Sequence, residues 1–244
     1  MSDAGEVRAA VESAYQLHRN GSLEAALAAL DRILSTVDPE GTCPSDDVAG
    51  VASVYAGMLV AHGRLDAAVL WARCAHRSLT AYREFWTPHA MRAAAIIAHV
   101  AARGGDHAQA ASCYAELLGR MRAWYGPSHR ETLACQADLA VAMHAAVTAQ
   151  GVGDCREARR LLGEAYADHR ASSGPDRAAL RMLTRLAVMT RECGDFDVAH
   201  RQFREARDLA RIYLDRADPL AVAITRAARD GRTTRHVCVP GPLD

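Results

Sequence analysis

One short pattern, a glycine followed five residues later by an alanine, recurs five times along the chain. Its copies are Gly21–Ala26, Gly63–Ala68, Gly105–Ala110, Gly153–Ala158 and Gly194–Ala199. The glycines lie 42, 42, 48 and 41 residues apart, a regularity that chance does not give in a chain with 17 glycines. A nearly fixed period of this length indicates a repeat architecture, in which each unit buries its apolar face against its neighbours.

The pattern is typical of a tight turn between two helices. Glycine ends the first helix in a left-handed conformation, and alanine allows the backbones of packed helices to approach closely. A second small residue lies seven residues before each glycine: Ala14, Ala56, Ala98, Ala187 and, in the fourth unit, either Ala146 or Ala140. Each unit is therefore predicted to carry two positions of close helix contact.

Apolar residues nine and twelve positions after each glycine give the second helix of every unit a stripe at helical spacing. Five prolines mark the joints between units, where a proline suits the first turn of a helix. The expected helices cover residues 3–19, 23–36, 46–62, 65–85, 89–103, 107–124, 128–149, 155–171, 176–192, 196–216 and 219–230. We therefore predict an all-α solenoid.

The solenoid is expected to form a single domain over residues 1–231, followed by a flexible tail at 232–244. Its five helix pairs would occupy residues 3–37, 46–86, 88–125, 127–173 and 175–217, with a lone capping helix at 219–230. About six extra residues in the fourth unit, within Val147–Val152, should lengthen its first helix or bulge its turn. The apolar, proline-rich tail is either free or docked onto the groove or a neighbouring molecule.

Composition limits the classes of function. The chain carries 29 basic and 29 acidic residues, and all of the basic ones are arginine, as expected of a GC-rich bacterial genome. A formal charge of zero gives no electrostatic reason to expect a nucleic-acid partner. No leader segment and no apolar run of membrane-spanning length is present, so we expect a cytoplasmic protein with no membrane contact.

Motifs for catalysis or for a cofactor are missing from the sequence. The seven cysteines are scattered and form no C-x-x-C pair, so we expect free thiols rather than disulfides or a metal site. No nucleophile elbow, phosphate-binding loop or dinucleotide fingerprint is present. We accordingly predict a protein that is not an enzyme, with no catalytic residues, no cofactor and no bound metal.

The order of small residue, glycine turn, alanine and large apolar residue resembles the tetratricopeptide repeat family over about residues 3–217. The long period, the segment Gly126–Leu133 and the following Asp138-Leu139-Ala140 are similar to the kinesin-light-chain type of repeat. This resemblance implies a right-handed α-α superhelix whose concave groove is lined by the first helix of each pair. That type carries an asparagine pair before Leu-Ala, whereas this chain has Ala137-Asp138 and Thr184-Arg185, so the peptide-binding role of the asparagines does not carry over.

Register along the first helices then predicts the side chains that face the groove. They are Arg8, Tyr15, Arg92, His99, Asp138, His144, Arg181, Thr184, Arg185 and Arg191. Arginines outnumber acids in this set and could bind carboxylates through paired hydrogen bonds. The alternative is a solvated helix face whose arginines pair with neighbouring acids.

The function that the sequence favours is a scaffold or adaptor that binds a protein or peptide in the groove. The alternative is a regulatory protein that senses a peptide or small molecule and controls a partner. Self-association through the apolar pair Phe85-Trp86, at a joint between units, is a further hypothesis about partners.

Overall fold

The computed structural model describes residues 4–81, 86–229 and 237–238 of the 244-residue chain. It consists of two compact units, Met1–Gly105 and Asp106–Asp244, each of which is described by itself. The boundary falls at a turn glycine inside the third predicted helix pair. That residues 1–231 form a single domain stays a prediction.

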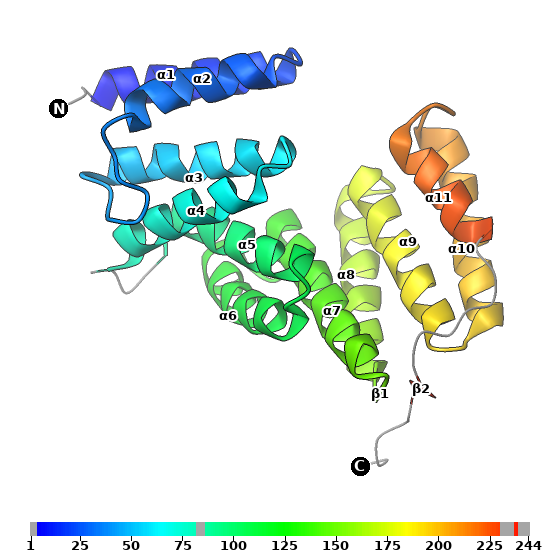
Figure 1. The fold of residues 1–244 in the computed structure, drawn as a ribbon. Helices are drawn as coiled ribbons and strands as arrows, with labels where there is room; N and C mark the ends of the chain where they lie inside the picture. Colours follow the sequence, from blue (N-terminus) through cyan, green and yellow to red (C-terminus); the bar gives the residue numbers. More distant parts are fainter. Residues whose placement is uncertain (1–3, 82–85, 230–236, 239–244) are drawn as a thin grey trace. The chain divides into compact units, whose positions relative to one another are not determined.

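Helices make up nearly all of the described structure (Figure 1). In the first unit they are α1 (Ala4–Arg19), α2 (Leu23–Leu34), α3 (Asp46–Ala61), α4 (Leu65–Thr80) and α5 (Pro88–Arg103). In the second unit they are α6 (His107–Tyr125), α7 (Arg130–Gln150), α8 (Arg156–Ser173), α9 (Arg177–Glu192), α10 (Phe196–Tyr213) and α11 (Pro219–Arg229). The predicted helices are confirmed to within a few residues, except that α4 ends at Thr80 and residues 82–85 lie outside the described part.

Local sequence signals explain where these helices begin. The Ser45 hydroxyl accepts a hydrogen bond from the Val48 amide at the start of α3, and the Thr87 hydroxyl does the same for Ala90 at the start of α5. Pro88 occupies the first turn of α5, where its missing N–H costs no helical hydrogen bond. These caps fix the points at which successive helices leave the joints between units.

Four of the five predicted turn glycines adopt the left-handed conformation, with φ between 78° and 92° at Gly21, Gly63, Gly105 and Gly194. The fourth unit differs from this prediction, because its left-handed residue is Gly151 (φ 79°) while Gly153 is nearly extended (φ 159°). Helical hydrogen bonding continues through the alanine-rich segment before Gly151, so the chain turns two residues earlier than the repeated pattern indicates.

The two alanine positions of every unit are buried. All five alanines before the turns, Ala14, Ala56, Ala98, Ala140 and Ala187, have 0% exposure, and the five that close the pattern are at most 3% exposed. Ala140 rather than the half-buried Ala146 therefore holds this position in the fourth unit. Side chains of this size let helix backbones approach closely at native packing density.

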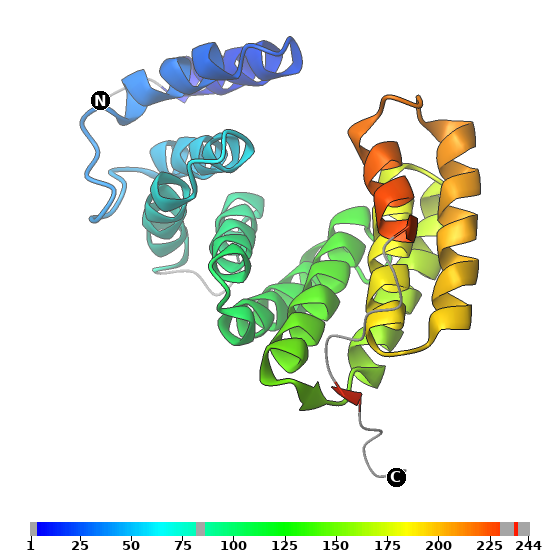
Figure 2. The same cartoon turned by 45° about the vertical axis from the view of Figure 1, so that its right-hand side comes forward.

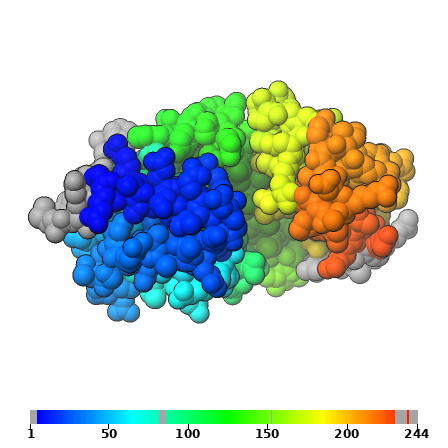
Figure 3. All heavy atoms as spheres, turned by 90° about the horizontal axis from the view of Figure 1, so that it is seen from above, coloured from blue at the N-terminus to red at the C-terminus, as the bar shows by residue number. Residues whose placement is uncertain are grey.

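Within each unit, first helices pack against first helices as well as against their own partners. In the first unit α3 contacts α1, α2, α4 and α5, and in the second α9 contacts α7, α8, α10 and α11. Figure 3 shows α1 and α2 at the near surface of the first unit. At the joint after α4, Trp86 packs edge-on against His76, with ring centroids 4.7 Å apart, whereas Phe85 lies outside the described residues.

The irregular fourth unit combines both of the outcomes expected for its extra residues. Helix α7 spans 21 residues, compared with 16 in α3, α5 and α9, and the chain then forms a short strand, β1 (Val152–Gly153). This strand pairs in parallel with β2 (Val237–Cys238), as Figure 2 shows. Thus two residues of the predicted tail lie against the fourth turn; the rest of residues 232–244 fall outside the described part.

Gly153 is required in β1 by a close approach to α7. A Cβ atom at this position would lie 2.6 Å from Cγ1 of Val147, which is closer than real Cβ contacts allow. The last turn of the lengthened helix and the strand are therefore packed tightly, and this fixes the direction in which the chain enters α8.

No helix in the described residues combines the length and the hydrophobicity that a membrane-spanning segment needs. The fold is all-α, a solenoid of helical repeats as predicted, and the pair of two-residue strands is its one addition within the described chain.

We expect Ala56→Leu to lower the free energy of unfolding by about 1–3 kcal/mol, because the larger side chain overpacks a fully buried helix contact in α3. Ala61→Leu, an exposed site at the end of the same helix, serves as the control and should change stability by less than about 0.5 kcal/mol. Urea unfolding followed by circular dichroism measures both values. Equal effects of the two substitutions would contradict the importance of the close contact.

Candidate functional site on the first helices

The predicted groove residues lie on α1, α5, α7 and α9, and we call the exposed side of the first helices within each unit the first-helix face. Arg8, Arg92 and Arg181 share one position in the repeat, six residues before the buried alanine of their helix. All three are exposed. Among the described residues, none of their guanidinium groups forms an ion pair with a carboxylate.

In the first unit, Arg92 of α5 donates a hydrogen bond from Nη1 to the Tyr15 hydroxyl of α1, at 2.6 Å. A hollow of about 430 Å³ lies on the same side, lined mainly by α1 and α3. Its charged lining is mixed, with Arg8 and Arg19 beside Glu12, Asp46 and Asp47. The hollow therefore offers both signs of charge to a ligand.

His89 of α5 closes one edge of this hollow. Its Nδ1 lies 3.0 Å from the hydroxyl of buried Ser53. Partial burial of the ring, and then the nearby Arg92 cation, lower the pKa of His89 below its ordinary value. The imidazole is consequently neutral near pH 7 and can act there as a hydrogen-bond partner rather than as a charge.

In the second unit, Nη1 of Arg185 on α9 lies 2.6 Å from Oδ1 of Asp138 on α7. The two side chains are 47% and 39% exposed. They hold equivalent positions in successive first helices, two residues before Ala187 and Ala140. Helical register in the sequence placed both residues on this face, but it did not indicate that their side chains bind each other.

Other predicted groove residues bind within the protein. The Thr184 hydroxyl donates to the Leu180 carbonyl at 2.7 Å, and Nη1 of Arg191 donates to the Ala227 carbonyl at 2.5 Å. The guanidinium of Arg191 also lies over the Phe203 ring, 5.2 Å from its centroid. His99 is half-buried. In the predicted set, four arginines are exposed and five side chains are half-buried: Arg8, Arg92, Arg181 and Arg185 in the first group, and Tyr15, His99, Asp138, Thr184 and Arg191 in the second.

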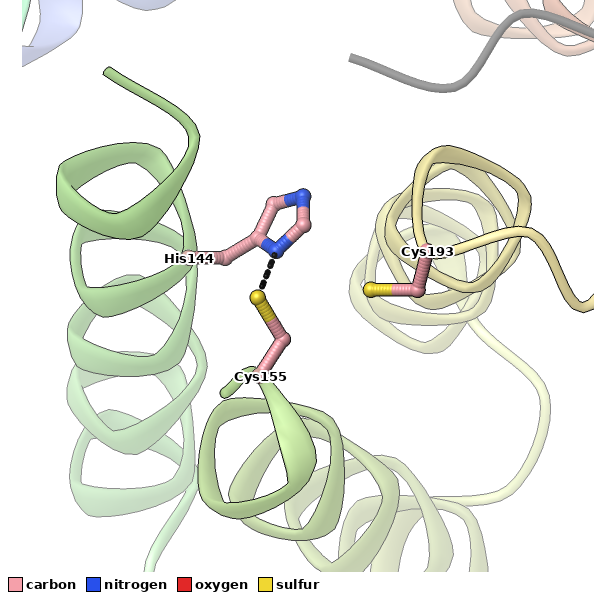
Figure 4. Close-up of side chains that lie close together, drawn as sticks. All are labelled: His144, Cys155 and Cys193. Carbon is pink, nitrogen blue, oxygen red and sulfur yellow. Dashed lines mark hydrogen bonds between the residues drawn. The ribbon is translucent and has the colours of Figure 1, made fainter. Parts of the chain in front are cut away.

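His144 is buried at 6% exposure, and both of its ring nitrogens face protein groups. Nδ1 lies 3.2 Å from Sγ of Cys155, and Nε2 lies 3.0 Å from Oε2 of Glu192. His144, Cys155 and Cys193 place their potential ligand atoms within 4.8 Å of one another. Figure 4 shows the three side chains close together. These three residues could hold a metal ion, which the sequence did not predict because they are far apart in the chain and share no motif.

Burial raises the pKa of the Cys155 thiol to about 11. Its side chain is fully buried, whereas a reactive cysteine needs an accessible sulfur and a stabilised thiolate. The His144–Cys155 pair therefore lacks the surroundings of a catalytic nucleophile.

A hollow of about 850 Å³ lies between α10 and α11. Five arginines and one carboxylate contribute charge to its lining: Arg207, Arg211, Arg216, Arg226, Arg229 and Asp215. It is separate from the first-helix face and sits at the end of the helix array. Its positive charge attracts anionic groups in general.

Because the Arg185–Asp138 pair is half-exposed, solvent screens most of its attraction. We expect Arg185→Gln to lower the free energy of unfolding by less than about 1 kcal/mol. A double-mutant cycle with Asp138→Asn, measured by urea unfolding at low and moderate salt, gives the coupling energy. A coupling above about 2 kcal/mol would show that the pair serves the fold rather than remaining available to a ligand.

No family model matches the sequence, and no curated protein matches it. Solved structures do resemble the protein. The crystal structure of a Podosopora anserina putative kinesin light chain with nearly identical TPR-like repeats has a TM-score of 0.65 and 20% identity, covering 87% of this chain and 99% of that one. BtubC (BKLC) from P. vanneervenii has a TM-score of 0.57 and 16% identity, covering 92% and 82%.

A tetratricopeptide repeat protein from Parabacteroides merdae also matches, with a TM-score of 0.52 and 14% identity over 91% of this chain and 73% of that one. These neighbours confirm the prediction of a tetratricopeptide-like repeat fold. At such identities the likeness concerns the fold alone.

Proposed function

We propose that this protein is a scaffold without catalytic activity, which binds an extended acidic segment of a partner protein along its first-helix face. The observation that carries the proposal is the set of exposed arginines at one repeat position, Arg8, Arg92 and Arg181, which have no carboxylate partner among the described residues. Repeat folds of this kind typically present extended surfaces for binding.

The chemistry of arginine supports an acidic partner. A guanidinium group is always charged and presents a planar fork of N–H donors that matches a carboxylate. Such charge-assisted hydrogen bonds are about twice as strong as neutral ones. Within the first unit, an extended peptide could place one carboxylate against Arg8 of α1 and another against Arg92 of α5.

The Arg185–Asp138 pair extends this interpretation in the second unit. Both side chains are partly exposed, so their mutual contact can be exchanged for contacts to a ligand at small cost. A carboxylate of the partner would take the place of Asp138 beside Arg185. The pair would then keep the guanidinium oriented before the ligand arrives.

A regulatory protein that changes shape on binding is the alternative function. It predicts a ligand-dependent change in the small-angle scattering curve, whereas a scaffold of fixed form predicts none. Both functions use the same face. Mass spectrometry of co-purified proteins would identify the partner, which is the ligand needed for the scattering measurement.

An array of extended peptides that differ in net charge tests the proposal. We expect the purified protein to prefer acidic peptides, and we expect Arg8→Ala/Arg92→Ala/Arg181→Ala to lower the affinity of the best peptide about tenfold or more, because charged hydrogen bonds are lost. Binding should also weaken as salt increases. Fluorescence anisotropy with the labelled peptide measures each affinity.

The control is Arg32→Ala/Arg73→Ala/Arg204→Ala, which removes three exposed arginines from second helices and changes the net charge equally. It should retain most of the affinity. Equal losses in the two triple variants would mean that overall charge, rather than the first-helix face, determines binding. The absence of any preference for acidic peptides would contradict the proposal directly.

A further inference from the structure

Three elements of the second unit bring chemically similar side chains to one point. His144 lies near the end of the lengthened helix α7, Cys155 is the N-cap of α8, and Cys193 is the C-cap of α9. Figure 4 shows the imidazole and both sulfur atoms directed toward one another. Their ligand atoms lie within 4.8 Å of one another, and Nδ1 of His144 lies 3.2 Å from Sγ of Cys155.

A fourth donor comes from the C-terminal segment. Parallel pairing of β1 and β2 puts Cys238 opposite Gly153, two residues before Cys155. The thiol of Cys238 lies close enough to the thiols of Cys155 and Cys193 to act on both electrostatically, although it stands outside the group of three whose ligand atoms lie within 4.8 Å of one another. A third thiol thus lies near the cluster of His144, Cys155 and Cys193 at the fourth turn, although more than ninety residues separate His144 from Cys238.

This set of donors fits a particular ion. Structural Zn²⁺ is bound in a tetrahedron by four cysteine or histidine side chains, and three cysteines with one histidine is a common set. With zinc–sulfur bonds of about 2.3 Å, the sulfur atoms of such a tetrahedron lie about 3.8 Å apart. Among the first three donors, no separation needs to shorten by more than about 1 Å to reach that geometry, and the separation between Nδ1 of His144 and Sγ of Cys155 needs to lengthen slightly.

The surroundings of His144 match those of a metal ligand. A histidine that binds a metal usually donates its other N–H to a carboxylate, which fixes the tautomer and the orientation of the ring. Nε2 of His144 lies 3.0 Å from Oε2 of Glu192, and this leaves Nδ1 directed toward the thiols. Glu192 is itself buried, at 9% exposure.

The net charge of the site is also accommodated. Zn²⁺ with three thiolates and a neutral imidazole carries one negative charge, and Glu192 adds a second. Arg159 on α8 lies close enough to Cys155 and Cys193 to act on both electrostatically, and it also binds Asp195. A cation beside the site reduces the cost of burying this negative charge.

We propose that His144, Cys155, Cys193 and Cys238 bind one Zn²⁺ ion, which fastens the C-terminal segment to the lengthened helix pair of the second unit. A pairing of two residues per strand is too short to hold a segment in place by itself. Metal ligation would supply the missing attachment. The proposal is independent of the function assigned to the first-helix face.

The first experiment measures zinc in the full-length protein. Protein purified under reducing conditions and equilibrated with Zn²⁺ is passed through a desalting column, and zinc is quantified by plasma mass spectrometry. We expect about one Zn²⁺ per chain. We also expect Co²⁺ to replace it and to give the charge-transfer and visible absorption bands of a tetrahedral thiolate site.

Variants identify the ligands. Cys155→Ser/Cys193→Ser should lose the bound zinc. Cys238→Ser changes a side chain outside the helices, so the helices should stay folded and zinc should bind less tightly. Glu192→Gln should retain zinc with an affinity about 10–100-fold lower, because the imidazole loses its orienting carboxylate. Circular dichroism establishes that each variant keeps its helical content.

A second thiol pair provides the matched control. Sγ of Cys43 and Sγ of Cys74 lie 3.2 Å apart in the first unit, and Cys43→Ser/Cys74→Ser removes two thiols without touching the proposed site. This variant should still bind one Zn²⁺. Its loss of zinc, or a substoichiometric amount of zinc in the wild-type protein, would overturn the proposal.

Peptide mapping of the freshly purified wild-type protein shows whether these cysteines are free thiols or form disulfides. We expect the thiols of Cys155, Cys193 and Cys238 to be free after removal of zinc. We expect the same thiols to be protected from alkylation when zinc is bound. A stable disulfide between any two of them in reduced protein would contradict the proposal and would assign the cluster to a covalent crosslink.

Discussion

The close approach of neighbouring helices at buried alanines is the constraint on which the rest of the structure depends. Ten alanines, two in each unit, have almost no exposed surface. A larger side chain at any of these points would separate the backbones and change the rotation from one helix to the next. Because the contact recurs in every helix pair, equivalent residues on the first helices of one compact unit face the same side. The alignment of Arg8 with Arg92 is therefore a consequence of the packing of Ala14 and Ala98.

The sequence was sufficient to predict the helices, because local chemistry determines them. Turn glycines, capping residues such as Thr87 and a regular apolar stripe act over a few residues, and they agree with one another in nearly every unit. The fourth turn was assigned to the wrong glycine for the same reason. Gly151 and Gly153 both suit a turn, and the choice depends on how far α7 continues, which the helix-forming residues Ala145–Gln150 decide.

Less of the candidate site could be predicted. Helical register indicated which residues share a face, but it contains no information on which side chains bind each other, so the Arg185–Asp138 contact and the burial of His144 were not foreseen. The thiol cluster was beyond prediction from single motifs. Cys238 lies near it through a strand of two residues that has no recognisable signal, and the partner strand directly follows α7, which is longer than the other first helices.

The irregular unit and the thiol cluster are best understood as one feature. An insertion that lengthens one helix interrupts the regular contacts of a repeat array, and at this point a buried imidazole of α7 contacts a buried carboxylate of α9. Burying such groups is costly unless they are paired and further compensated. The insertion also positions Cys155 beside that imidazole, and through β1 it positions Cys238 near the thiols of Cys155 and Cys193. The irregularity thus brings together donors for a metal ion, whose binding would stabilise the point at which the repeat is interrupted.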